Sequence, residues 1–263
     1  MQQPKSEIAD LFAQRQAIKN RLSQTCALDE VSIERLKRRF RKMLKSPTLS
    51  QAQQAAVYHE LACLVGTQGR YTEAVSYMES SRGLGMDKFA VSFTTAYLAL
   101  LNGRIIDARL LVENISSSVL PQTIPLLRAH QAQVGMLGDF MAEETLDSDF
   151  QREALEAKKV IGRLGISDFE ITRRLDAACT LIRSHINHPI ISYKLFASET
   201  EGILYRFLVN ADTNKLADLN EMVLDMLIER FDEEIDNELS ILVTPWSPSD
   251  SQISEEGYLV GVV

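Results

Sequence analysis

Two histidines and one cysteine are the residues whose types and spacing come nearest to a metal site. His185 and His188 form an H-x-x-H pattern, and Cys179 lies six residues before the first histidine. Imidazole and thiolate groups are ligands that zinc prefers. The pattern stops at Pro189, which breaks the expected helix, and no second pair of ligands follows. We therefore predict no metal site, and expect His185 to lie at a helix C-terminus, where the helix dipole favours a cation.

A run of carboxylates nearer the C-terminus raises the same question for calcium. Asp232, Glu233, Glu234, Asp236 and Glu238 are close together in the sequence. An EF-hand loop needs a glycine and ligands at alternating positions, and this run has neither. A solvated acidic loop is the expectation.

Sequence patterns of known catalytic sites are absent. The chain has no G-x-x-x-x-G-K-[ST], G-x-S-x-G or H-E-x-x-H. Its glycine pairs, Gly83 with Gly85 and Gly162 with Gly165, follow helical runs, which is typical of helix ends and not of phosphate-binding loops. We predict that the protein is not an enzyme and that it has no catalytic residues and no cofactor.

Positive charge is concentrated near the N-terminus. Residues 1–48 contain 11 Lys and Arg against 5 Asp and Glu, a net +6, whereas the other 215 residues carry 17 against 31, a net −14. Several cations on one helix face could neutralise the phosphates of a nucleic acid. The candidate electrostatic patch consists of Arg35, Lys37, Arg38, Arg39, Arg41, Lys42 and Lys45.

Two alternatives to nucleic acid exist for this basic helix. Solvated helix faces are often basic, no interleaved aromatic residues are available for base stacking, and the whole chain is acidic, with a net charge of −8. Residues 212–238 contain ten carboxylates and two basic groups. We therefore expect the basic helix to face the acidic part of the same chain or of a second copy.

Apolar periodicity predicts two helices within residues 6–44. Ser6 can cap the first, and Asp29 or Ser32 can cap the second. The apolar stripe of the first helix is Ile8, Leu11, Phe12, Ile18 and Leu22, and that of the second is Ile33, Leu36, Phe40, Met43 and Leu44.

Further along, small residues recur at a spacing of 34 residues. Ala62, Gly69 and Ala74 are repeated as Ala96, Gly103 and Ala108. Two antiparallel helices can approach closely where small side chains lie at their crossing. A period of 34 residues is typical of tetratricopeptide (TPR) helix-turn-helix repeats.

Residues 55–121 resemble TPR proteins, and no family is recognised for the remainder. The second repeat, 89–120, is weaker than the first, and a degenerate third unit or plain helical hairpin is expected at 122–157. In the first repeat Met78 and Met86 replace an aromatic residue and the closing proline. The matching positions of that repeat are Tyr58, Leu61, Ala62, Gly69, Tyr71, Ala74 and Ser81.

The resemblance implies a groove formed by the first helix of each repeat. It places His59, Cys63, Phe93, Tyr97 and Leu100 toward a partner peptide or helix, with Phe93 and Tyr97 as anchors. The alternative is that the N-terminal helices cover these residues and that they are core. The implied function is a non-enzymatic protein–protein interaction module, such as an adaptor, chaperone, immunity or antitoxin-type factor. A TPR-type regulator that contacts nucleic acid through the basic helix is the alternative.

Beyond residue 188 the apolar pattern alternates and predicts a β-β-α-β module. Strands are expected at 191–197, 203–209 and 239–243, and the helix begins at Asp212 or Thr213. A small sheet of this kind has at least one free edge. The apolar tail Tyr258 to Val263 could cover that edge, or two copies could pair, so we expect a homodimer.

These patterns predict a mainly α fold with four parts. They are a basic N-terminal helical hairpin (1–48), a TPR-like helical array with capping helices (49–187), the small α+β module (188–246), and a mobile acidic linker with an apolar tail (247–263). The odd number of cysteines, Cys26, Cys63 and Cys179, indicates buried reduced thiols. The sequence shows neither a secretory signal nor a run of about 20 apolar residues, so we expect a cytoplasmic protein without a membrane partner. Small size and compactness suggest a bacterial source.

Overall fold

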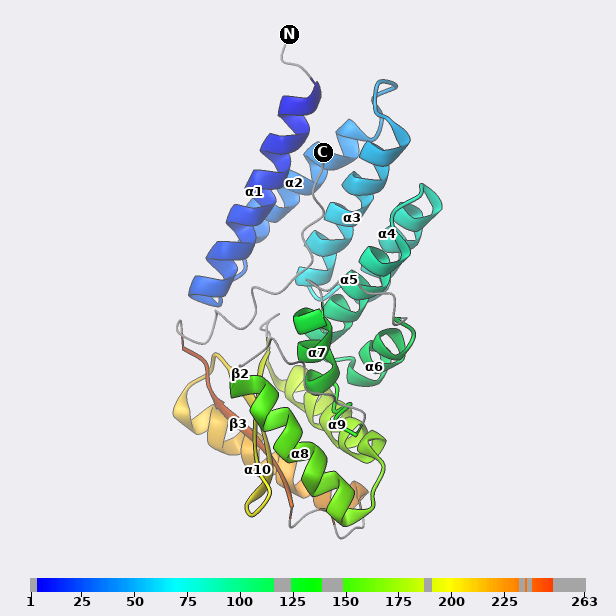
Figure 1. Cartoon of the computed structure of the whole chain (residues 1–263). Helices are drawn as coiled ribbons and strands as arrows, with labels where there is room; N and C mark the ends of the chain where they lie inside the picture. The colour runs from blue at the N-terminus through cyan, green and yellow to red at the C-terminus, as the bar shows by residue number, and fades with distance from the viewer. Residues whose placement is uncertain are drawn as a thin grey trace. The chain divides into compact units, whose positions relative to one another are not determined.

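The computed structural model shows two compact units, which divide between Asn102 and Gly103 (Figure 1). The first unit is helical, and the second combines helices with a three-stranded sheet, so the predicted fold class, mainly α with a small C-terminal sheet, is confirmed. The division falls inside the predicted helical array 49–187. The described residues are 4–115, 124–138, 149–186, 191–231, 235 and 238–247.

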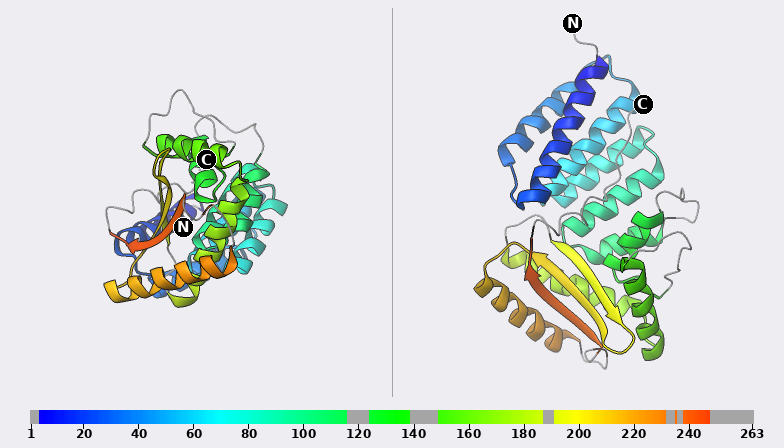
Figure 2. Two further views of the ribbon diagram at one scale, coloured as in Figure 1. Left: turned by 90° about the horizontal axis from the view of Figure 1, so that it is seen from below. Right: turned by 60° about the vertical axis from the view of Figure 1, so that its left-hand side comes forward.

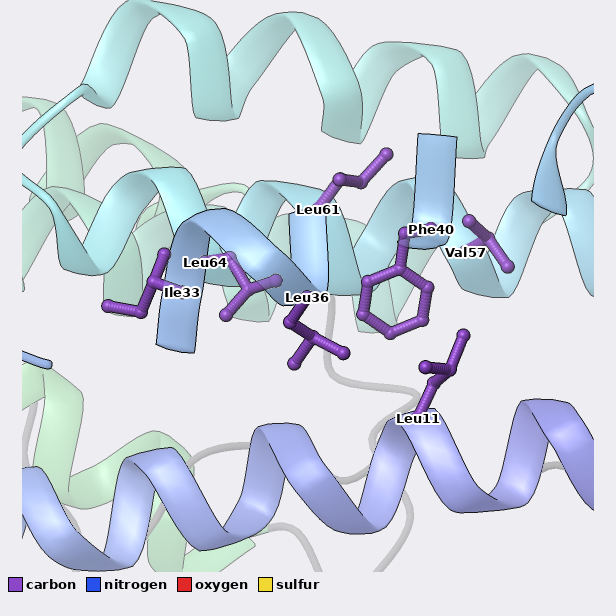
Figure 3. Close-up of a cluster of buried hydrophobic side chains, with 7 residues drawn as sticks. All are labelled: Leu11, Ile33, Leu36, Phe40, Val57, Leu61 and Leu64. Carbon is purple, nitrogen blue, oxygen red and sulfur yellow. The ribbon is translucent and has the colours of Figure 1, made fainter. Parts of the chain in front are cut away.

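The first unit is built from helices that pack on their sequence neighbours (Figure 2). They are α1 (Pro4–Thr25), α2 (Glu30–Met43), α3 (Gln51–Thr67), α4 (Tyr71–Gly83) and α5 (Lys88–Leu101). In addition, α1 and α5 both pack on α3. The predicted apolar stripes of α1 and α2 meet α3 in one core cluster, drawn in Figure 3, which consists of Leu11, Ile33, Leu36, Phe40, Val57, Leu61 and Leu64.

Short polar residues fix where these helices begin. The side chain of Asp29 accepts a hydrogen bond from the backbone N–H of Ser32, so Asp29 and not Ser32 caps α2. The prediction that Ser6 caps α1 is wrong, because α1 already begins at Pro4. Proline is tolerated in the first turn of a helix, where its missing N–H would have no partner within the helix.

The small residues of the 34-residue pattern lie at crowded positions. The side chains of Ala62, Ala74, Ala96 and Ala108 have no exposed surface. Gly69 and Gly103 both follow a helix and have φ values of +80° and +69°, a conformation that side chains disfavour. These features are compatible with a helical repeat.

The second unit contains helices α6 to α10 and one three-stranded sheet. In the sheet, β1 pairs antiparallel with β2, and β2 pairs parallel with β3, so the predicted order β-β-α-β is confirmed. Asp212 caps α10. The elements are α6 (Ile105–Glu113), α7 (Ile124–Gln133), α8 (Asp149–Leu164), α9 (Asp168–His185), β1 (Ser192–Ser198), β2 (Gly202–Val209), α10 (Thr213–Arg230) and β3 (Leu239–Pro245).

One face of the sheet carries the core of this unit. Tyr193 on β1 lies directly opposite Phe207 on β2, and both are buried. The Tyr193 hydroxyl lies 3.4 Å from Sγ of Cys179 on α9, and the Tyr205 hydroxyl donates to the Ala132 carbonyl of α7 at 2.7 Å. Figure 2 shows α9 behind the sheet in its right-hand view. Polar side chains thus fix two helices to this face.

Both outer strands of the sheet are hydrogen-bonded by helix side chains. Glu153 of α8 accepts the backbone N–H of Ala197 on β1 at 2.6 Å. The Asn220 amide of α10 makes two bonds of 2.8 Å with the backbone of Val243 on β3, one as donor and one as acceptor. In the part of the sheet that the structure describes, β1 and β3 are edge strands that pair only with β2, as predicted, and the chain's own side chains occupy the backbone groups at Ala197 and Val243. The predicted tail, 258–263, lies outside the described residues, as do residues 122–123 and 139–148 of the proposed third unit.

Candidate functional site

The five residues predicted to line a groove lie on two adjacent helices, α3 and α5. His59 and Phe93 are fully buried, Leu100 and Cys63 are 3% and 9% exposed, and Tyr97 is half-buried. Four of the five side chains thus belong to the interior in this conformation, as the alternative of a covered groove expects. A role for the five residues in partner binding stays a prediction.

A chain of polar contacts runs through this interior and connects three helices. Nε of Arg15 on α1 lies 2.6 Å from Oε2 of Glu60 on α3. Nδ1 of His59 lies 3.4 Å from Oε1 of the same carboxylate, and its Nε2 lies 3.0 Å from the Thr94 hydroxyl on α5. We call Arg15, His59, Glu60 and Thr94 the buried polar cluster. Through this cluster, α1 contacts Glu60 of α3, and α5 contacts the neighbouring His59 of α3.

The electrostatics around this cluster favour a structural role over a chemical one. Burial would raise the pKa of Glu60, but the ion pair with Arg15 and the hydrogen bond from His59 outweigh it and hold that pKa below its usual value. Burial raises the pKa of Cys63 to about 12, and that of Tyr97 also to about 12. A thiol that stays protonated at neutral pH is a poor nucleophile.

The residues considered for zinc are separated by their surroundings. Cys179 is fully buried beside Tyr193, and burial raises its pKa to about 11. His185 lies at the end of α9, where its Nδ1 is 3.0 Å from the Leu181 carbonyl oxygen. His188 lies outside the described residues. Within the described ranges, no three His, Cys, Asp or Glu side chains lie close enough to hold a metal ion.

The acidic run considered for calcium is described at one position. Nη2 of Arg163 lies 2.8 Å from Oε2 of Glu238, whose backbone carbonyl accepts the N–H of Ile203. Glu238 therefore fixes the start of β3. The other four carboxylates, at 232–234 and 236, lie outside the described residues.

Three of the seven residues in the candidate electrostatic patch are used within the first unit. Lys37 is fully buried, with its Nζ 2.6 Å from Oε1 of Glu34 and 2.8 Å from Oε1 of Gln68, so its assignment to a surface patch is wrong. A lysine at this position bends inward because its long stem can pack while its ammonium group reaches two acceptors. Arg39 donates to Gln14 of α1, and Arg41 donates to Tyr77 of α4.

The other four cations are exposed along the outer face of α2 and just beyond its C-terminal end. Arg35, Arg38 and Lys42 lie on one side of the helix at spacings of three and four residues, and Lys45 follows in the turn after the helix ends at Met43. We call these four residues the basic row. Val31, one turn before Arg35, is 61% exposed at the same side. Among the residues that the structure describes, no ion pair engages the row.

Sequence reasoning did not find the buried polar cluster. Arg15 and Glu60 are 45 positions apart, and Arg15 sits among other charged or polar residues of its helix. A weak signal exists, because Glu60 directly follows His59 inside a long apolar stretch of α3. A carboxylate at such a position needs a cation, but the sequence alone offers several.

The comparisons with known proteins add no family. No family model, curated protein or solved structure matches the chain. A search of the described helices for one long and apolar enough to cross a membrane found none.

Proposed function

We propose that the protein is a non-enzymatic interaction module whose first unit binds a helix or peptide of another protein. The helical hairpins, which the 34-residue pattern relates to TPR repeats, provide the scaffold. The observation that carries the proposal is the basic row, which is exposed along one side of α2 while the opposite side of that helix is locked in the core. An adaptor, chaperone, immunity or antitoxin-type factor could use such a surface to bind its partner.

The chemistry of the row indicates an acidic partner. Its three helical cations, Arg35, Arg38 and Lys42, extend over about 10 Å, the length of seven residues of helix. Exposed ion pairs contribute roughly 0–1 kcal/mol each, so they set orientation and the rate of association more than affinity. Contact with exposed apolar side chains such as Val31 must supply the rest. An acidic amphipathic helix meets both needs.

Contact through the predicted groove is part of the same proposal. Tyr97 is the groove residue with exposed surface, so it is the position where a partner could touch this side of α5. His59 and Phe93 then support the surface from behind.

Nucleic acid is the second candidate, because the same four cations could neutralise phosphates. The aromatic ring of α2 does not favour it, since Phe40 is fully buried and cannot stack on a base. Binding of nucleic acid through charge alone should fall steeply with salt.

Affinity capture from the native host with the full chain as bait tests the proposal. The variant Arg38→Glu/Lys42→Glu reverses two cations of the row, and Arg82→Glu/Lys88→Glu reverses two other exposed cations of the first unit as a matched control. The row variant should lose a protein that the wild type and the control retain. Identical captured proteins in all three samples would contradict the proposal, and a raised absorbance ratio from co-purified nucleic acid would favour the second candidate.

A further inference from the structure

The outer face of α10 carries a row of carboxylates with almost the same spacing as the basic row. Asp218, Glu221, Asp225 and Glu229 are exposed and follow one another at three, four and four residues. In the basic row, Arg35, Arg38 and Lys42 follow at three and four residues, and Lys45 comes after the end of α2. The acidic row is therefore about 16 Å long, and the helical part of the basic row is about 10 Å long. We call these four carboxylates the acidic row.

The inner face of α10 explains why the acidic row points outward. Leu216, Leu219 and Val223 are buried, and Asn220 is bonded to Val243 of β3. The helix is thus held in one rotational setting. Residues on its other side, including the acidic row, cannot turn toward the sheet.

Apolar side chains lie beside both rows. Leu224 and Ile228, one turn apart on α10, are 59% and 60% exposed, and Val31 beside the basic row is 61% exposed. Single exposed apolar residues are ordinary, but two adjacent ones next to four carboxylates form a face that a complementary helix could cover. Within the described ranges, no ion pair engages any member of the acidic row.

We propose that the basic row of one copy of this chain binds the acidic row of a second copy. The inference rests on the proposed function, since it uses the same surface of α2 and names a second copy of the chain as one protein that binds there. Charge complementarity and the matched spacing favour this occupant over an unrelated acidic protein. Every copy also supplies both rows at the same concentration.

Two-fold pairing would use each row once. One contact between two short helices buries less surface than the roughly 1,000 Å² of a stable interface, whereas a two-fold dimer contains two such contacts. In that dimer, α2 of each copy contacts α10 of the other. Added salt should weaken it, because exposed charges are screened.

The test is charge reversal followed by mixing, read as molar mass by light scattering of the full chain. Arg38→Glu/Lys42→Glu reverses the two central charges of the basic row, and Glu221→Lys/Asp225→Lys reverses the two central charges of the acidic row, so the changed row has no net charge in either variant. Each variant alone should have the mass of a monomer, whereas the wild type has twice that mass. An equimolar mixture should regain the doubled mass, because the reversed central charges of one variant then meet those of the other, and the two unchanged rows meet each other.

Recovery in the mixture also shows that the variants are folded. A control with the exposed carboxylates Glu79→Lys/Glu201→Lys should remain a dimer. The inference is overturned if the wild type is monomeric, if either variant alone keeps the doubled mass, or if the mixture stays monomeric. The proposed function fails separately, when the row variant still captures the same foreign protein as the wild type.

Discussion

The two units anchor their helices with different kinds of polar contact. In the first unit the buried charged contact between helices joins two side chains, Arg15 and Glu60, although the Ser81 hydroxyl also donates to the Ala55 carbonyl. In the second unit the sheet and helix ends add bonds from side chains to backbone groups, as in Asn220 with Val243 and Tyr205 with Ala132, beside the side-chain contacts of Arg109. The difference follows from architecture, because helices use their backbone groups internally whereas edge strands and helix ends leave some open.

This difference predicts which polar substitutions reduce the stability of the protein most. When one member of a buried ion pair is removed, the other charge remains without compensation in a poorly solvated place. When a side chain that bonds an edge strand is removed, water can reach the backbone group instead. Polar substitutions should therefore destabilise the first unit more than the second.

Removal of Arg15 is expected to have the largest effect. In Arg15→Met, Glu60 keeps its buried position and loses its cation, which should lower the free energy of unfolding by about 3–5 kcal/mol. Urea unfolding followed by circular dichroism measures it. The matched control is Arg21→Met on the same helix, because Arg21 pairs with Asp29 on the surface, with its side chain 67% exposed. That control should cost about 1 kcal/mol or less. Equal losses in the two variants would contradict the importance of the buried polar cluster.

Acid should weaken the second unit before the first. Burial lowers the pKa of His130 from 6.5 to about 4, so the unfolded chain binds a proton below pH 6.5 that the folded chain does not accept until about pH 4. Stability is therefore lost as the pH falls through this range, by at most about 3 kcal/mol. In the first unit Glu60 has a pKa below its usual value of 4.5, so the unfolded chain takes up a proton there before the folded chain does. The stability that Glu60 contributes is therefore lost only as the pH falls below 4.5.

Trp246, the single tryptophan of the chain, lies in the second unit and reports its unfolding by fluorescence. The substitution His130→Gln should reduce the loss of stability of the second unit between pH 6.5 and 4. His185→Gln, which changes an exposed histidine at the end of α9, should leave the decline as in the wild type. If the second unit of His130→Gln still loses stability over this pH range as the wild type does, another titrating group is responsible.

The same comparison explains what could be predicted from the sequence. Elements with local signals were found: the apolar stripe and Asp29 cap of α2, the glycines Gly69 and Gly103, and the alternation of the β-β-α-β module. Contacts between distant positions were not, because nothing near Arg15 points to Glu60. The burial of Lys37 was missed for the same reason, since both it and its neighbours on α2 are basic. Local sequence patterns determine where helices and strands form. Which of many charged side chains pair with one another depends on how those helices and strands pack.

Arg109 offers an intermediate case within the second unit. Its guanidinium group bonds Asp168 at 2.8 Å, the Thr172 hydroxyl at 2.7 Å and Glu113 at 2.6 Å. Asp168 also accepts the backbone N–H of Gly138, so it keeps one donor when the arginine is lost. We expect Arg109→Met to lower the free energy of unfolding by about 2 kcal/mol, less than Arg15→Met. Arg104→Met, which removes a surface pair with Asp107, is the control and should change little. A larger loss for Arg109→Met than for Arg15→Met would reverse the comparison.

The smallest effect is expected at the outer edge of β3. Asn220→Ala removes both hydrogen bonds to Val243 but leaves no charge behind, and water can solvate the freed backbone groups. The loss should be about 1 kcal/mol, measured by urea unfolding with Trp246 fluorescence. Asn214→Ala, at the exposed start of α10, is the matched control and should change stability less, because its side chain lies away from the sheet. If Asn220→Ala instead costs as much as Arg15→Met, then solvent does not reach the edge of β3, and the contrast between the two units cannot be explained by access of water to backbone groups.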